Sequence, residues 1–116
     1  DGINGAVPHV NQRVTFVAAA ASPLPRIMEA ARARGWDTVR FVSTDGTTFN
    51  RDYLAESADG EQLPMFNVFQ RDGETIRHFW GSELFYAPTD PGQDPRHVDC
   101  IDAIWSMFDL APEGRG

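Results

Sequence analysis

Lysine is absent from this sequence of 116 residues, and cysteine occurs only once. All 10 basic side chains are therefore arginines, against 17 acidic ones, and the formal net charge is -7. Binding to nucleic acid or to an anionic membrane needs clustered cations that neutralise phosphates, so we expect neither as the main partner. A single thiol, Cys100, can form neither an internal disulfide nor a zinc cage of several thiolates, which excludes dithiol chemistry within this chain.

Long apolar runs are also missing. The longest, residues 14–21, is far shorter than the roughly 20 residues that cross a bilayer. No charged segment followed by an apolar one opens the chain as a secretion signal would, and we therefore expect a soluble, cytoplasmic protein. The sequence begins at Asp1 and not at methionine, so we expect it to be part of a longer product. Its length suits one domain with a single core over residues 1–116.

The first half of the chain has the pattern of a βαβ unit. Residues 1–12 have the apolar spacing of the end of a helix, although glycines and a proline weaken it. Residues 14–20 form a continuous apolar run, which is typical of a central strand covered on both faces. Ser22 as N-cap and Pro23 at the first helical position predict a helix after this strand. Residues 38–43 are rich in residues that favour strands and predict an outer strand.

The second half predicts a hairpin and a last helix. Residues 44–62 are polar and rich in turn formers, so we expect a mostly irregular connection. Residues 65–70 and 75–80 flank the Asp72–Gly73 dipeptide, which is a strong signal for a β-hairpin. Residues 95–109 predict a helix that packs on the sheet. The apolar stripe of this helix contains Val98, Ile101, Trp105 and Phe108.

A proline directly before a strand, an Asp-Gly hairpin and a final helix follow the βαβ unit. This order resembles the thioredoxin-like fold, and the long connection between Ser43 and Leu63 resembles its peroxiredoxin branch. Nearly the whole chain resembles, more specifically, a bacterial thioredoxin-like family of unknown function, described as predicted dithiol-disulfide oxidoreductases. The motifs that carry this resemblance are NRDY (Asn50–Tyr53), PMFNVFQRDG, IRHFWGSELFYAP, DPGQDPRHVD and DLAPEGRG. The resemblance implies an α/β fold with a mixed sheet and flanking helices.

The resemblance also implies where a substrate would bind. In this fold the proline before the strand is usually cis and faces the redox cysteines, so we expect a cis peptide bond before Pro64 and a substrate groove at Leu63, Pro64 and Met65. In the family, the strand and turn that carry the cysteines precede the part that matches Asp1 onward. No residue here inherits the nucleophilic cysteine, so we expect no catalytic residue and no turnover from this chain alone.

The missing strand would be the central one, which leaves a gap in the sheet. Buried backbone groups without partners are rarely tolerated, so three outcomes are open. An additional N-terminal segment fills the gap, another protomer donates a strand, or the flanking strands close up and pair antiparallel. For these residues alone we expect closure in the order 38–43, 14–20, 65–70, 75–80, with self-association into a homodimer.

Three side chains are candidates for a small pocket, namely His78, Trp80 and Tyr86. Aromatic residues beside a hairpin belong to the core more often than to a ligand site, and a hydrogen-bonded structural histidine is the favoured interpretation of His78. Neighbouring aspartates disfavour a thiolate at Cys100. His97 and Cys100 alone do not make a metal site, and we expect no metal and no cofactor.

Two functions remain open at this stage. The first is a thiol-disulfide oxidoreductase domain whose catalytic cysteines lie outside the chain and whose partner is a thiol- or disulfide-bearing protein or small molecule. The second is a redox-inactive thioredoxin-like module that binds a peptide or small molecule beside Pro64.

Overall fold

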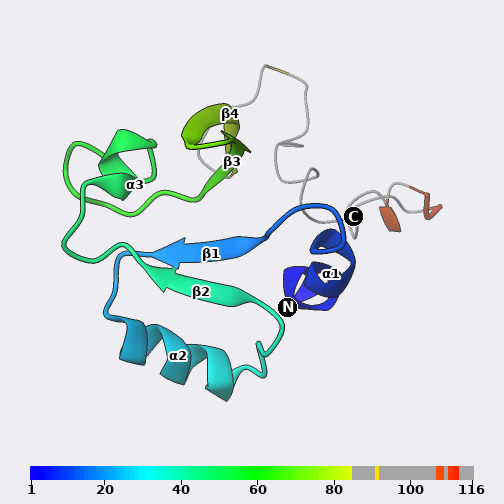
Figure 1. Ribbon diagram of the computed structural model, residues 1–116. Helices are drawn as coiled ribbons and strands as arrows, with labels where there is room; N and C mark the ends of the chain where they lie inside the picture. The colour runs from blue at the N-terminus through cyan, green and yellow to red at the C-terminus, as the bar shows by residue number, and fades with distance from the viewer. Residues whose placement is uncertain (85–90, 92–106, 109, 113–116) are drawn as a thin grey trace. The chain divides into compact units, whose positions relative to one another are not determined.

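The computed structural model describes residues 1–84, 91, 107–108 and 110–112. Its helices and strands mix along the chain, which confirms the α/β class (Figure 1). They are α1 (Gly2–Val10), β1 (Val17–Ala20), α2 (Leu24–Ala33), β2 (Arg40–Ser43), α3 (Phe49–Asp52), β3 (Met65–Asp72) and β4 (Thr75–Glu83). The chain divides into two compact units, Asp1–Asn50 and Arg51–Gly116. That both belong to one domain stays a prediction.

The first unit contains the predicted βαβ arrangement. Strands β1 and β2 pair in parallel, from Val17 opposite Arg40 to Ala20 opposite Ser43. Helix α2 connects them and begins one residue later than expected, because Pro23 is the N-cap with ψ 136° and is not yet helical. The helix predicted near the N-terminus is present as α1.

Strand β1 is less buried than its sequence predicts. Its residues alternate between exposed and half-buried, and Val17 is 38% exposed, so coverage on both faces was the wrong expectation. The physical reason lies in the composition of the strand, which continues as Ala18–Ala20. An alanine side chain removes little apolar area from water, so a run of alanines is apolar without requiring cover on both faces.

Hydrogen bonds between Thr38 and Asn4 tie α1 to the segment between α2 and β2. The side-chain Oδ1 of Asn4 accepts from the backbone N–H of Thr38 at 3.1 Å and from the Thr38 hydroxyl at 2.8 Å. The indole Nε1 of Trp36 donates to the carboxylate of Asp1 at 2.6 Å. The apolar core of this unit is small, and its buried members are Val7, Ile27 and Ala31.

Thr44 follows β2 and places a polar group in the interior. Its side chain is 9% exposed, and its hydroxyl oxygen has no hydrogen-bond partner in the part of the chain that the structure describes. A buried hydroxyl without a partner costs about 1–3 kcal/mol. Thr44→Val should therefore raise the free energy of unfolding by about 1 kcal/mol or more, measured by urea denaturation. Thr38→Val is the matched control, because the Thr38 hydroxyl is hydrogen-bonded and its loss should lower stability. A destabilised Thr44→Val protein would contradict the assignment of an unpartnered hydroxyl.

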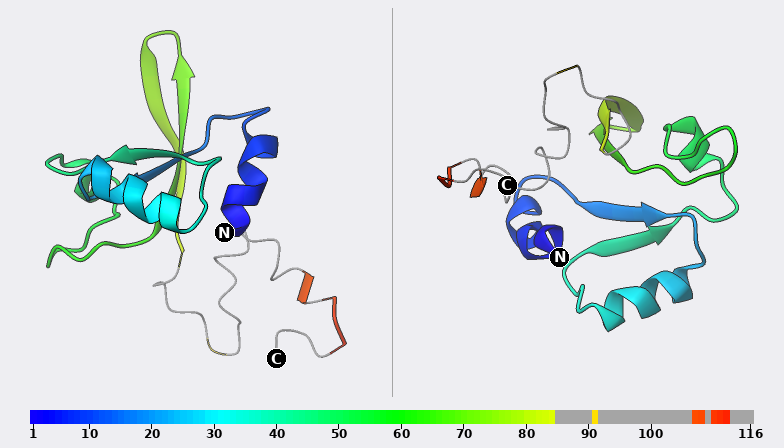
Figure 2. Two further views of the ribbon diagram at one scale, coloured as in Figure 1. Left: turned by 90° about the horizontal axis from the view of Figure 1, so that it is seen from below. Right: turned by 180° about the vertical axis from the view of Figure 1, so that it is seen from behind.

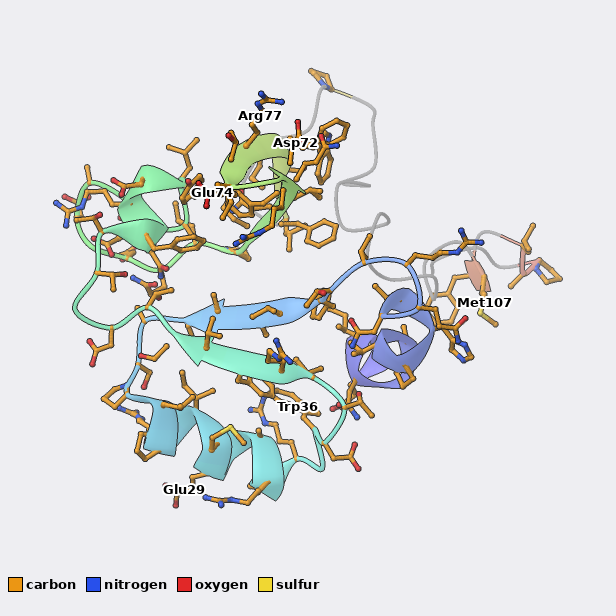
Figure 3. The ribbon with its side chains drawn as sticks, viewed as in Figure 1. Glu29, Trp36, Asp72, Glu74, Arg77 and Met107 are labelled. Atoms are coloured by element: carbon orange, nitrogen blue, oxygen red, sulfur yellow. The ribbon has the colours of Figure 1, made fainter. Side chains whose placement is uncertain are left out.

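The second unit contains the predicted hairpin, extended by residues 71–72 at the turn and by residues 81–83 at the base. Strands β3 and β4 pair antiparallel from Met65 opposite Glu83 to Asp72 opposite Thr75, and form the long two-stranded ribbon of Figure 2. Gly73 has a φ of 59°, a conformation that glycine adopts without strain at a tight turn. The labelled side chains of Asp72 and Glu74 lie at this turn (Figure 3).

The pairing of the strands corrects two expectations. The described strands form two separate two-stranded sheets, β1–β2 and β3–β4, so the four-stranded order with residues 14–20 paired to 65–70 is wrong. Each strand pairs with a neighbour in sequence, for which closing the intervening loop costs less entropy than for the longer connection. The Leu63–Pro64 peptide bond is trans, so the expected cis bond is also wrong; X–Pro bonds are trans unless tertiary contacts enforce the alternative.

Two further expectations concern the remaining chain. The predicted helix over residues 95–109 lies outside the described residues, apart from 107 and 108. Among the helices that the structure describes, none has the length and apolar character needed to cross a membrane.

Candidate functional site

The candidate groove residues are held on both sides by main-chain hydrogen bonds. The backbone N–H of Leu63 donates to the carbonyl of Ala55 at 2.9 Å. On the other side, the carbonyl of Pro64 accepts from the N–H of Leu84 at 3.2 Å, and Met65 pairs with Glu83 as the first pair of the hairpin. Leu63, Pro64 and Met65 are all half-buried. The segment before β3 is thus fixed although its proline is trans.

A small loop leads into this segment. Glu56 and Gln62 form an isolated antiparallel bridge, and their side chains are joined by a hydrogen bond of 3.3 Å from Gln62 Nε2 to Glu56 Oε2. Ser57 closes the turn, since its N–H donates to the Glu61 carbonyl at 2.9 Å and its hydroxyl accepts from the Glu61 N–H at 3.0 Å. The loop therefore behaves as a miniature hairpin in front of Pro64.

His78 is hydrogen-bonded to Asn67 across the β3–β4 hairpin. The distance between His78 Nε2 and Asn67 Oδ1 is 2.9 Å. Asn67 Oδ1 can only accept, so His78 Nε2 is the donor in this contact. In the neutral ring with its proton on Nε2, the other nitrogen, Nδ1, is an acceptor. The pair exists because the register shifts near Phe79: His78 lies opposite Phe69 and Trp80 opposite Val68, so Phe79 is an extra residue in β4.

Two aromatic rings, those of Tyr53 and Phe69, pack against this histidine. The ring of Tyr53 meets Phe69 edge-on at 4.9 Å between centroids and His78 at 5.3 Å, and Phe69 lies 5.2 Å from His78. Tyr53 comes from the chain just after α3. We call Tyr53, Asn67, Phe69 and His78 the imidazole cluster. It fits the structural interpretation of His78, although the side chain itself remains exposed.

The pocket residues expected from sequence are not all brought together. Trp80 packs edge-on against Phe66 at 5.9 Å, on the face of the hairpin opposite to the imidazole cluster. Tyr86 and Cys100 lie outside the described residues. The alternation of β3 places Asn67 and Phe69 on one face, but the bulge that turns His78 toward them left no signal in the sequence.

Gly81 leaves the room that the His78–Asn67 contact needs. A Cβ atom at this position would lie 2.9 Å from Asn67 Oδ1 and 3.1 Å from His78 Nε2. Gly81→Ala should therefore push the Asn67 and His78 side chains apart and lower the free energy of unfolding by about 0.5–1.5 kcal/mol, the contribution of one hydrogen bond, as measured by thermal denaturation. Gly5→Ala is the control, because a Cβ at this position in α1 meets nothing within 4 Å, and it should stabilise by about 0.5–1 kcal/mol. If Gly81→Ala is as stable as the parent in a protein that retains the His78–Asn67 contact, the steric argument fails.

The described residues do not combine into a metal centre. In residues 1–84 and the short described segments after them, no three His, Cys, Asp or Glu side chains gather closely enough to hold an ion. The polar groups described at the candidate site are the main-chain groups beside Pro64 and the imidazole of His78.

Comparisons with known proteins place the chain in a family. No curated protein matches it. No solved structure matches it either. The profile of a family described as "Bacterial protein of unknown function (DUF899)" matches residues 1–116, the whole length of the chain. The chain therefore belongs to this bacterial family of unknown function.

Proposed function

We propose that this chain is the thioredoxin-like part of a thiol-disulfide oxidoreductase whose catalytic cysteines lie outside residues 1–116. The observation that carries the proposal is the order and pairing of the strands. A parallel β1–α2–β2 crossover is followed by an antiparallel β3–β4 hairpin that begins directly after Pro64. Two features depart from the thioredoxin-like pattern, namely the trans bond before Pro64 and the separation into two sheets.

The chemistry of such an enzyme needs two thiols. An attacking thiolate forms a bond to one sulfur of a substrate disulfide, and the other substrate sulfur leaves as a thiolate. A second cysteine then attacks the mixed disulfide and releases the first substrate sulfur, so that two electrons pass from the enzyme dithiol to the substrate. A dithiol donor would have to reduce the enzyme disulfide again by the same exchange. This chain has one thiol, so its own part is to hold the substrate beside Leu63–Met65.

A specific observation favours a second function, binding without redox chemistry. The imidazole cluster is assembled from residues of this chain and holds an exposed His78 in one orientation by Asn67 and two rings. The Nδ1 atom of His78 could accept a hydrogen bond from a peptide or small molecule, and this needs no cysteine. The partner in either case is a protein or small molecule, and formation of a homodimer stays a prediction.

The two functions are separated by an insulin-reduction assay. We compare the 116-residue chain with a longer chain that also contains the cysteine-bearing strand and turn expected from the family. Turnover by the longer chain alone supports the oxidoreductase. Inactivity of both chains, at concentrations at which each is folded by circular dichroism, contradicts it and favours the binding module.

A further inference from the structure

The segment Leu63–Pro64 forms main-chain hydrogen bonds with a different partner on each of its two sides. In an extended chain, the N–H and C=O groups of successive residues point to opposite sides. The Pro64 carbonyl accepts from Leu84, which follows β4, so this side belongs to the hairpin. The main-chain groups of Leu63 therefore face away from β4, toward the side on which an added strand would pair.

That outer side is occupied by the chain itself. The Ala55 carbonyl accepts the Leu63 N–H at 2.9 Å, and the bridge between Glu56 and Gln62 continues the pairing away from Pro64. Residues 55–61, which we call the edge-covering loop, thus act as a short antiparallel strand and turn. Peptides that add to a sheet edge bind through main-chain hydrogen bonds. The loop therefore engages the Leu63 N–H, which is the donor that an added peptide would need.

We infer that the edge-covering loop is an autoinhibitory contact, and that it must leave Leu63 before an extended peptide segment can bind beside Pro64. The inference rests on the proposed function, since it concerns the same groove, and it names the substrate class as an extended polypeptide and not a compact small molecule. Because only molecules with an open loop can bind, the apparent association constant for the peptide equals the intrinsic one multiplied by the fraction of molecules in which the loop is open.

Several features make displacement of this loop inexpensive. Glu61 is exposed, and the contacts of the bridge include a main-chain bond on each side and a solvent-exposed bond between the Gln62 and Glu56 side chains. Apart from Ala55, Ala58 and Gly60, the side chains of the loop are polar, so opening uncovers little apolar surface. Segments with few buried apolar contacts open locally at low cost in free energy.

A reversible cross-link tests the inference. Glu56 and Gln62 lie directly opposite each other, and the bonds on either side of them mark a non-hydrogen-bonded pair, whose Cα atoms are about 4.5 Å apart. This spacing accepts a disulfide. We introduce Glu56→Cys and Gln62→Cys together with Cys100→Ser, and measure binding of fluorescent carboxymethylated insulin B chain, an extended peptide without free thiols. The reduced protein should bind at least 10-fold more tightly than the oxidised one.

A second pair of cysteines is the control for the cross-link itself. Gln70 and Arg77 face each other near the turn of the hairpin, and both are exposed. A disulfide between Gln70→Cys and Arg77→Cys should leave B-chain binding unchanged. In addition, Ser57→Ala removes the hydroxyl that accepts from Glu61 and should raise affinity about 2- to 5-fold by increasing the open fraction.

The outcomes separate the loop from the groove. Equal binding by the oxidised and reduced Glu56→Cys/Gln62→Cys protein overturns the autoinhibitory contact but leaves peptide binding, and with it the proposed function, intact. Absence of binding in the reduced, the oxidised and the Ser57→Ala proteins overturns both. Tighter binding only after reduction supports both, provided that the Gln70/Arg77 cross-link has no effect.

Discussion

The 116-residue chain is expected to give no measurable disulfide reductase or peroxidase turnover, and Cys100→Ser is expected to leave this baseline unchanged. Dithiol catalysis needs an attacking thiolate and a second cysteine that resolves the mixed disulfide, whereas Cys100 is the single cysteine. Its neighbours in sequence, Asp99 and Asp102, disfavour the charged thiolate that would attack. A longer chain that carries the cysteine-bearing segment should be active in both assays.

Insulin reduction and peroxide consumption measure this difference directly. The parent, the Cys100→Ser variant and the longer chain are compared at equal concentration, with dithiothreitol as reductant. Turnover by the parent that disappears in Cys100→Ser would mean that the lone thiol is catalytic, and the proposal that the catalytic cysteines lie elsewhere would be wrong. Turnover that survives in Cys100→Ser would show that the rate does not depend on a thiol of this chain.

Ile27→Ala should lower the free energy of unfolding by about 2–4 kcal/mol, the largest effect on stability that we expect from one substitution. Ile27 lies on α2 and is 8% exposed. Removal of three buried carbon atoms loses their transfer free energy and leaves a cavity. The loss is large relative to the whole, because Val7 and Ala31 are the other buried apolar side chains described in this unit.

Urea denaturation followed by circular dichroism measures the effect, with Met28→Ala as the control. Met28 is the next residue of the same helix but is 38% exposed, so its truncation should change stability by less than about 1 kcal/mol. Equal destabilisation by the two substitutions would mean that α2 does not use Ile27 as its buried anchor.

Local sequence patterns were enough to predict helix α2 and the β3–β4 hairpin. The apolar spacing of α2 and the turn at Asp72–Gly73 depend on interactions within one element or between adjacent strands, and both elements were found. Patterns of this kind do not report how much area a side chain buries. The alanines at 18–20 therefore predicted a fully covered strand, whereas Ala19 is exposed and its two neighbours are half-buried. Local patterns also do not report which strands pair over long distances, which is why the closed four-stranded sheet was wrong.

The candidate site was predictable only in part. His78 was singled out by its residue type, but its partners depend on the extra residue at Phe79, and a bulge changes the facing of a side chain without changing composition. Asn67 and Tyr53 were missed for the same reason. The engagement of Leu63 by Ala55 involves main-chain atoms, which every residue has, so no residue type could have signalled it.

The pairing of the hairpin also bears on the order of events during folding. The pair most distant from its turn joins Met65 to Glu83, so all contacts between the two strands are local in sequence. Hairpins of this type form within about 1–10 μs. Pairing β1 with β2 must wait for α2 to form and pack, since a parallel pair requires a crossover. The hairpin with its tight turn is therefore the part of this chain that can organise first, and the Pro64 segment acquires its hydrogen bond to Leu84 as the hairpin closes at its base.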